Sequence, residues 1–342
     1  MTPSTPPSAT ESQVLAVLAG TPLEQAAHQI HMDPADLADA IEAYQAAGRA
    51  ALQPQARDWF QARIQFTDWD SAEQIAATSL GPHLQLACEA GTLSGWWFMR
   101  KHPCWRLRCH RGPATTTASL RTAIGAVLDS LVTSGTVQRW QESLYEPEAL
   151  AFGGPHGMDI AHDVFHADSH GILTYLRHSQ PALPPGQVAG RRELSILLCT
   201  SMFRSARQDD HEQGDVWHRV AQARPLASDP PASQLRGMTP GLQLLISLDT
   251  SPAGTLFGAA GPLSFAAPWS AAFTEAGRQL ADAARDGTLD RGLRDILAKH
   301  VIFHWNRLGL TAGAQAVLAR AARETLMNPP ATPPPRADVP GT

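Results

Sequence analysis

The sequence predicts an α+β fold: a ferredoxin-like, split βαβ antiparallel sheet, followed by a mainly helical part and preceded by a small N-terminal helical module. Three observations predict this fold. Between residues 62 and 145 the patterns follow the order strand, helix, strand, strand, helix, strand, which is the order of a split βαβ unit. From about residue 158 the patterns are mainly helical, and residues 11–50 hold three short helical patterns.

Composition narrows the class of protein. The chain has 342 residues and is 43% hydrophobic, which suits two domains or one large domain with a small attachment. It contains no run of 18 apolar residues, so no membrane span is expected, and its first ten residues lack the charged and apolar regions of a signal peptide. The four cysteines form no CxxC pair and no metal-binding spacing, as expected for reduced thiols in a cytoplasmic protein.

The net charge of −5 is unevenly placed. Residues 1–58 contain seven acidic and two basic residues and therefore carry the whole of it, while the rest of the chain balances to zero. Three short helices could form a helix-turn-helix, but an acidic module is unsuited to contact phosphates, so no DNA is expected as a partner. A docking or lid module and a plain helical extension both stay open.

The elements of the first third follow from capping and turn residues. Residues 1–10 are rich in Pro, Ser and Thr and are predicted to be disordered. Helices are predicted over 12–19, 22–31 and 34–48, because Thr21-Pro22 and Asp33-Pro34 begin helices and Gly48 ends one. The split βαβ unit is predicted to have strands over 62–68, two strands within 93–111 around a turn at His102-Pro103, and a strand over 137–145. Its helices are predicted over 71–91 and 115–134.

The second half reads as helices joined by loops. A loop rich in Pro and Gly leads to a helix over 158–176, and a linker over 181–190 leads to the next helices. Helices are predicted over 191–206, 209–219, 242–248, 269–287, 289–308 and 312–327, with a long loop through most of 225–265. Six prolines in 328–342 predict a disordered tail. The predicted division is thus 1–10 disordered, 11–57 helical module, 58–327 main domain, and 328–342 tail.

Arg106 and Arg108 are the first candidate site. The strand alternates, with Trp105, Leu107 and Cys109 pointing one way and the two arginines the other, roughly 7 Å apart. Between residues 90 and 128 there are six Arg or Lys and no Asp or Glu. Two guanidinium groups on one face predict a site for a carboxylate or phosphate. The alternative is a solvated strand face with two scattered charges.

Histidines provide the second set of candidates. His162, His166 and His170 recur every four residues, but no glutamate accompanies them as in HExxH, so no metal is expected. His300 and His304 also lie four residues apart on one predicted helix, beside Arg307. Each can be either a buried structural residue or a shielded general base. Nucleotide-binding and other cofactor motifs are absent, so no cofactor is expected.

Three segments together carry a family resemblance: WWFMRKHPCWRLR, then YEPEALAFGGPHGM with the following AHDVFHADS, then HWNRLG. In this order they resemble the C-terminal domain of lantibiotic dehydratases, which also occurs alone as the thiopeptide-type bacteriocin biosynthesis domain. The resemblance covers about residues 59–327. It implies a lyase that eliminates glutamate from glutamylated Ser or Thr of a precursor peptide, leaving dehydroalanine or dehydrobutyrine.

Other activities of the superfamily keep alternatives open. One relative joins two dehydroalanines in an aza-[4+2] cycloaddition, which makes a pyridine and expels the leader peptide. Another branch adds amino acids to a peptide from aminoacyl-tRNA, but its members carry a glutamylation domain. A further alternative is a non-catalytic peptide-binding partner of a larger dehydratase. The expected partners are a precursor peptide with a leader and a separate glutamylating dehydratase, and the sequence leaves open whether the chain forms a homodimer.

The resemblance also implies roles for individual residues. Arg106 and Arg108 match the Arg-hydrophobic-Arg pattern that holds the leaving glutamate, and Arg307 is expected to help bind the substrate. A histidine before the Asn-Arg pair is expected to be the base. His304 precedes Asn306 by two residues, whereas the commoner spacing falls at Ile302, so His300 is the second candidate. Ala151 stands where relatives often have an arginine, which weakens the case for elimination.

Overall fold

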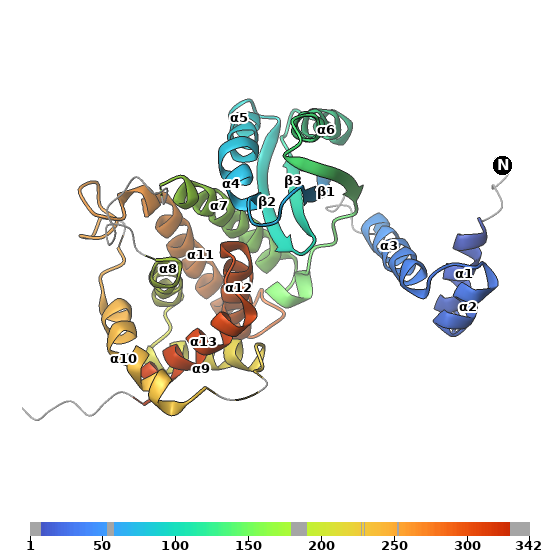
Figure 1. The fold of residues 1–342 in the computed structure, drawn as a ribbon. Coiled ribbons are helices and arrows are strands. Elements are labelled where there is room, and N and C mark those ends of the chain that lie inside the picture. Colours follow the sequence, from blue (N-terminus) through green and yellow to red (C-terminus); the bar gives the residue numbers. More distant parts are fainter. Residues whose placement is uncertain are drawn as a thin grey trace, which may run out of the picture. The chain divides into compact units, whose positions relative to one another are not determined.

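The computed structural model describes residues 8–52, 58–178, 190–226, 228, 230–251 and 253–328, which Figure 1 shows as a ribbon. It separates into two compact units. The first, called here the sheet unit, comprises Met1–Ala72, Pro82–Trp96 and Lys101–Pro147. The second, the helical unit, comprises Glu73–Gly81, Trp97–Arg100 and Glu148–Thr342.

The sheet has four strands in the order β2-β3-β1-β4. The strands are β1 Trp59–Phe66, β2 Leu93–Lys101, β3 Cys104–Arg111 and β4 Val137–Ser143. β1 pairs antiparallel with both β3 and β4. This arrangement is the split βαβ order, so the predicted α+β class and sheet type are confirmed.

Strand alternation separates the sheet into an apolar and a polar face. On the apolar face, β1 and β3 place buried side chains directly opposite one another: Phe60 with Cys109, Ala62 with Leu107, and Ile64 with Trp105. Helix α6, Thr117–Thr133, packs there through its buried Leu120, Ile124, Leu128 and Leu131. Because the side-chain period of a strand is two, the intervening residues of β1 and β3 all point to the other face.

The helix predicted over 71–91 consists of three pieces. They are α4 Ala72–Ile75, a π-helical turn at Ala76–Leu80, and α5 Gly81–Glu89. Such π-helical insertions occur as single turns within α-helices. The prediction of one continuous helix missed this interruption, because hydrophobic spacing over so few residues does not distinguish a π turn from an α turn.

The N-terminal helices are α1 Ala9–Leu18, α2 Leu23–Gln29 and α3 Pro34–Leu52, drawn in blue in Figure 1. They share a small core of Val14, Ala26, Ala27 and Leu37. Two predictions were wrong in detail. Helix α1 already includes Ala9 and Thr10, where disorder was expected, because Ser8 caps it by accepting a hydrogen bond from the backbone N–H of Glu11. Helix α3 continues past Gly48 to Leu52, because glycine weakens a helix without necessarily ending it.

The helical unit contains seven α-helices among its described residues from 148 onward. They are α7 Pro155–His178, α8 Arg191–Ser205, α9 Asp210–Gln222, α10 Ala232–Ser247, α11 Ala267–Arg285, α12 Leu293–Leu308 and α13 Ala312–Met327. Two 3₁₀ turns, Ala149–Phe152 and Ser264–Ala266, precede α7 and α11. No helix among the described residues is long and apolar enough to cross a membrane.

Helix α10 is the largest departure from the predicted elements in this unit. A long loop with a helix over 242–248 was expected, but α10 begins ten residues earlier, at Ala232, and has Pro240 in its interior. Proline and glycine in this segment favoured a loop prediction, yet α10 packs against α8 and α13, and such tertiary contacts can outweigh weak local propensity. Residues 329–342 of the predicted tail and residues 181–189 of the predicted linker lie outside the described residues.

Candidate functional site

The polar face of the sheet carries a ladder of three cross-strand pairs. Trp59 lies opposite His110, Gln61 opposite Arg108, and Arg63 opposite Arg106. Directly opposed residues in an antiparallel pair point to the same face. At the positions of β1, β3 and β4 that share this face, all of them described residues, there is no Asp or Glu. The predicted grouping of two arginines is therefore part of a wider basic face of the sheet.

Arg108 is held in one orientation by neighbours in the sheet unit. Its Nε donates to the Gln61 side-chain oxygen at 2.6 Å, and its guanidinium carbon lies 4.8 Å from the centre of the Tyr145 ring. The Gln61 amide in turn donates to the Ser143 hydroxyl at 2.9 Å and to the Leu144 carbonyl at 2.6 Å. These contacts orient a nearly buried guanidinium before any ligand arrives, which lowers the entropy cost of binding.

Arg63 is a residue of this face that the sequence reasoning did not select. Its side chain stands directly across from Arg106, and its Nε is buried without a hydrogen-bond partner. Like charges directly opposite on neighbouring strands are destabilising, so their juxtaposition favours a bound anion. The alternation of residues 62–68 contained Arg63, but only the pairing register of β1 with β3 places it beside Arg106.

His110 was also missed. It follows Arg108 by two residues on β3 and therefore lies on the same face. Its ring centre is 4.8 Å from that of Trp59, and its Nδ1 is 2.5 Å from the Ser94 hydroxyl. The signal was available, because the alternation that selected Arg106 and Arg108 reaches His110 when it is continued by one more step.

The predicted histidine and arginine of α12 meet a different partner, in the helical unit. Asp168 of α7 accepts three hydrogen bonds: from His304 Nδ1 at 2.8 Å, from Arg307 Nε at 2.6 Å, and from Trp269 Nε1 at 2.9 Å. The side chains of Asp168, His304 and Arg307 are all fully buried. This group is called the Asp168 cluster below.

Electrostatics keep Asp168 ionised in this buried place. Burial by itself raises the pKa of the Asp168 carboxyl, but His304 and Arg307 outweigh it, and the pKa lies below its ordinary value. Burial lowers the pKa of Arg307, and the charge of Asp168 opposes that effect. The Arg307 guanidinium also lies 4.4 Å from the centre of the Phe165 ring. A buried charge with this many partners is costly to disrupt.

Family-like segments of the sequence converge on the Asp168 cluster. Asp168 belongs to AHDVFHADS, and His304 and Arg307 belong to HWNRLG. The next residue, Ser169, accepts a hydrogen bond from the backbone N–H of Phe98 in WWFMR at 3.2 Å. The segments that carry the resemblance are therefore joined, at least in part, by buried hydrogen bonds within the helical unit.

His300 lies one helical turn before His304 and is 2% exposed. Its ring packs against Phe152 and Phe165, with ring centres at 5.1 and 6.0 Å, and neither ring nitrogen has a hydrogen-bond partner. Burial and the positive charge of Arg307 lower the pKa of His300 to about 3, although the negative charge of Asp168 opposes this shift. His300 is thus a neutral core residue at neutral pH.

The structure brings the predicted site residues together in two groups. Arg106 and Arg108 share one sheet face, and His304 and Arg307 share Asp168, with His300 one turn away. The expectation that His304 is the base stays a prediction. His162, His166 and His170 lie on α7, and within the described ranges no three metal-binding side chains group together. The expectation that no metal is needed stays a prediction as well.

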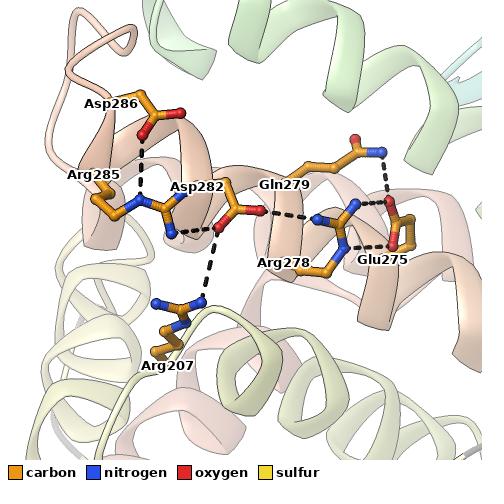
Figure 2. Close-up of polar contacts among 7 residues, drawn as sticks. All are labelled: Arg207, Glu275, Arg278, Gln279, Asp282, Arg285 and Asp286. Atoms are coloured by element: carbon orange, nitrogen blue, oxygen red, sulfur yellow. Dashed lines mark hydrogen bonds and ion pairs between the residues drawn. The ribbon is translucent and has the colours of Figure 1, made fainter.

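A partly exposed row of charges along α11, joined by Arg207, contrasts with the Asp168 cluster. Figure 2 shows Asp282 between Arg278 and Arg285, each at 2.9 Å, with Arg207 at 3.9 Å. Glu275 also pairs with Arg278 at 2.5 Å. Exposed pairs of this kind contribute little stability each. We interpret this row as a solvated helix face.

The Asp168 cluster predicts a large difference between two aspartate substitutions. Asp168→Asn is expected to lower the free energy of unfolding by about 3–5 kcal/mol, because it leaves Arg307 buried without its counter-charge. The matched control Asp282→Asn on the partly exposed row is expected to cost less than about 1 kcal/mol. Urea unfolding followed by circular dichroism measures both. Equal, small losses would contradict a structural role for the cluster.

The lowered pKa of His300 predicts how the stability of the protein depends on pH. Between its ordinary pKa of about 6.5 and its folded pKa of about 3, only the unfolded chain takes up this proton. Stability should therefore fall as the pH drops through this range, with His300 contributing up to about 1.4 kcal/mol per pH unit. His300→Leu is expected to flatten the slope, whereas a leucine at the exposed His211 should not. Unfolding curves from pH 7 to 4 test this, and an unchanged slope in His300→Leu would contradict it.

Comparisons with known proteins place this chain in a family. Residues 59–326 match the family model described as lantibiotic biosynthesis dehydratase C-term. The chain is 17% identical to the tRNA-dependent lantibiotic dehydratase MibB from Microbispora sp. 107891, with a TM-score of 0.58, covering 80% of this chain and 28% of MibB. It therefore spans little more than a quarter of the length of MibB.

Two shorter proteins are matched over nearly their whole length. TsrL is 16% identical with a TM-score of 0.53, covering 78% of this chain and 95% of TsrL. The pyridine synthase TbtD from thiomuracin biosynthesis is 13% identical with a TM-score of 0.57, covering 79% and 97%. No curated protein matches the sequence. At these identities the three structures show the fold alone. The family model, in contrast, covers most of the chain, so the chain belongs to the family of lantibiotic biosynthesis dehydratase C-terminal domains.

Proposed function

We propose that this protein eliminates glutamate from glutamylated Ser or Thr residues of a precursor peptide, which leaves dehydroalanine or dehydrobutyrine. The observation that carries the proposal is the basic face of the sheet, where Arg63, Arg106 and Arg108 stand together. The family itself takes part in the enzymatic modification of peptides. The substrate is a precursor peptide with a leader, glutamylated beforehand by a separate dehydratase.

The chemistry of the leaving group fits three guanidinium groups. A glutamyl ester already carries one free carboxylate, and breaking the bond between Cβ and the ester oxygen forms a second. Arginine binds carboxylates through two parallel hydrogen bonds. A guanidinium that is oriented in advance stabilises the charge that develops in the transition state. Arg108, fixed by Gln61 and Tyr145, is suited to the leaving carboxylate, and the Arg63–Arg106 pair to the free one.

His304, the base expected from the sequence, has a different role in this proposal. Its side chain is fully buried and its Nδ1 is bonded to Asp168. A general base has to come within hydrogen-bonding reach of the proton that it removes. We therefore assign His304, with Arg307, to the stability of the helical unit. His300 is excluded as the base on the same ground, because it is almost wholly buried between aromatic rings.

The second candidate function is the aza-[4+2] cycloaddition of two dehydroalanines. It is favoured by the match to nearly the whole length of the pyridine synthase TbtD. It is also favoured by Ala151, which stands where relatives often have an arginine. Cycloaddition releases no glutamate, so a glutamate-binding arginine group has no part in it. The two functions therefore differ in their dependence on Arg106 and Arg108.

The proposal predicts that Arg106→Ala and Arg108→Ala each slow elimination by about 10²–10³-fold, because each removes a donor to a developing or free carboxylate. The matched control is Arg139→Ala on β4, which shares the face but is exposed and donates to Gln65 at 2.9 Å. Mass spectrometry of a glutamylated precursor peptide, incubated with each variant, measures the conversion.

The same assay is run with a peptide that carries two dehydroalanines, and binding of both peptides is measured; three outcomes would sink or replace the proposal. Conversion at the wild-type rate by both arginine variants would remove the carboxylate site. A wild-type protein that leaves the glutamylated peptide unchanged but cyclises a peptide with two dehydroalanines would establish the second candidate. A protein that binds the peptide and converts neither substrate would be a non-catalytic partner.

A further inference from the structure

We propose that His110 is the general base of the elimination, and that Ser94 fixes its tautomer. This inference rests on the proposed elimination and names the residue that removes the Cα proton. It assigns the base to the sheet unit, where the arginines lie, rather than to α12. Three observations on the described residues carry it, namely position, hydrogen bonding and exposure, together with the covalent geometry of the substrate.

Position comes first. Arg106, Arg108 and His110 alternate along β3, so that consecutive members lie on one face about 7 Å apart. Their cross-strand contacts confirm the shared face: Arg108 bonds to Gln61, and the His110 ring lies against Trp59. A base and a carboxylate site on the same strand keep a constant separation, which positions reacting groups without a conformational change.

Hydrogen bonding determines which nitrogen of His110 carries the proton. The Ser94 hydroxyl donates to the backbone carbonyl of Arg111 at 3.0 Å. Because a hydroxyl has only one hydrogen, this donation leaves the Ser94 oxygen as the acceptor in the contact with His110 Nδ1 at 2.5 Å. We infer from this arrangement that neutral His110 carries its proton on Nδ1, which leaves the lone pair that a general base needs on Nε2.

Exposure separates His110 from the other candidates. Ser94 is exposed and His110 is half-buried, whereas His304 is fully buried and His300 is 2% exposed. Packing of Trp59 against the His110 ring limits its rotation. His110 thus combines access with a restrained orientation, as a catalytic histidine requires.

The substrate spans the distance between the carboxylate site at Arg108 and the base at His110. In a glutamylated serine, the ester oxygen that leaves and the Cα that loses its proton are separated by one carbon atom. A leaving carboxylate bound at Arg108 therefore holds the Cα–H within one side-chain length of His110.

The proposed step balances without a further reactant. His110 Nε2 takes the Cα proton, and the electron pair of the Cα–H bond forms the Cα=Cβ double bond. The bond between Cβ and the ester oxygen breaks, and its electron pair leaves on glutamate, whose new carboxylate Arg108 binds. The imidazolium then loses its proton to water, which restores the starting state.

The test uses the full chain and a synthetic peptide in which an internal serine is esterified with glutamate. His110→Gln keeps a donor for Ser94 but has no basic nitrogen, and it is expected to lower kcat about 10²–10⁴-fold with little change in KM. The control His211→Gln, on the exposed first turn of α9, should match the wild type. Thermal unfolding of each variant verifies that it is folded.

Ser94 acts through His110, and its role is measured by the tautomer of His110 as well as by activity. The ¹⁵N spectrum of the wild type should show His110 protonated on Nδ1 near neutral pH. Ser94→Ala should lose this tautomer preference and lower kcat more than it alters KM. Ser94→Thr, which keeps the hydroxyl, should retain both the tautomer preference and the wild-type kcat. A wild-type spectrum with the proton on Nε2 would contradict the tautomer argument.

The outcomes distinguish this inference from the function on which it rests. Elimination by the wild type but not by His110→Gln supports both. Elimination at the same rate by the wild type and by His110→Gln overturns the role of His110 and leaves the proposed function in place. Loss of activity in a folded His304→Gln variant, with His110→Gln still active, has the same meaning. A wild type that does not release glutamate from the peptide overturns the proposed function and the base assignment with it.

Discussion

The register between β1 and β3 is the constraint on which the site depends. Pairing Ile64 with Trp105 buries an apolar ladder under α6, and it necessarily places Arg63 beside Arg106 and Gln61 beside Arg108 on the other face. A slip of one residue would exchange the two faces. The free energy of burying Trp105 and its neighbours therefore also maintains the grouping of cations, which would otherwise repel one another.

A second constraint holds the helical unit. Asp168 accepts from His304, Arg307 and Trp269 in a fully buried place. Burying two full charges is expensive, and only good geometry with further hydrogen bonds offsets that cost. The cluster therefore ties α7, α11 and α12 together at one point. A histidine in a family-like segment can serve this structural purpose, so its presence alone does not identify a catalytic base.

How much the sequence could predict depends on the range of the interactions involved. The strand order and the Arg106–Arg108 face followed from local alternation, and the same alternation reached His110 when continued. Arg63 required the pairing of distant strands. Asp168 is 136 residues from His304, and no periodic pattern links them. Helix α10, with Pro240 in its interior, formed where tertiary packing overrode local propensity.

The most direct test of the central claim, that the basic sheet face binds the carboxylates of glutamate, is an NMR titration of the arginine Nε–H groups with free L-glutamate. We expect saturable shifts at Arg63, Arg106 and Arg108, and none at Arg139 on the edge strand β4. Shifts that are absent, or that are equally large at Arg139, would contradict a built carboxylate site.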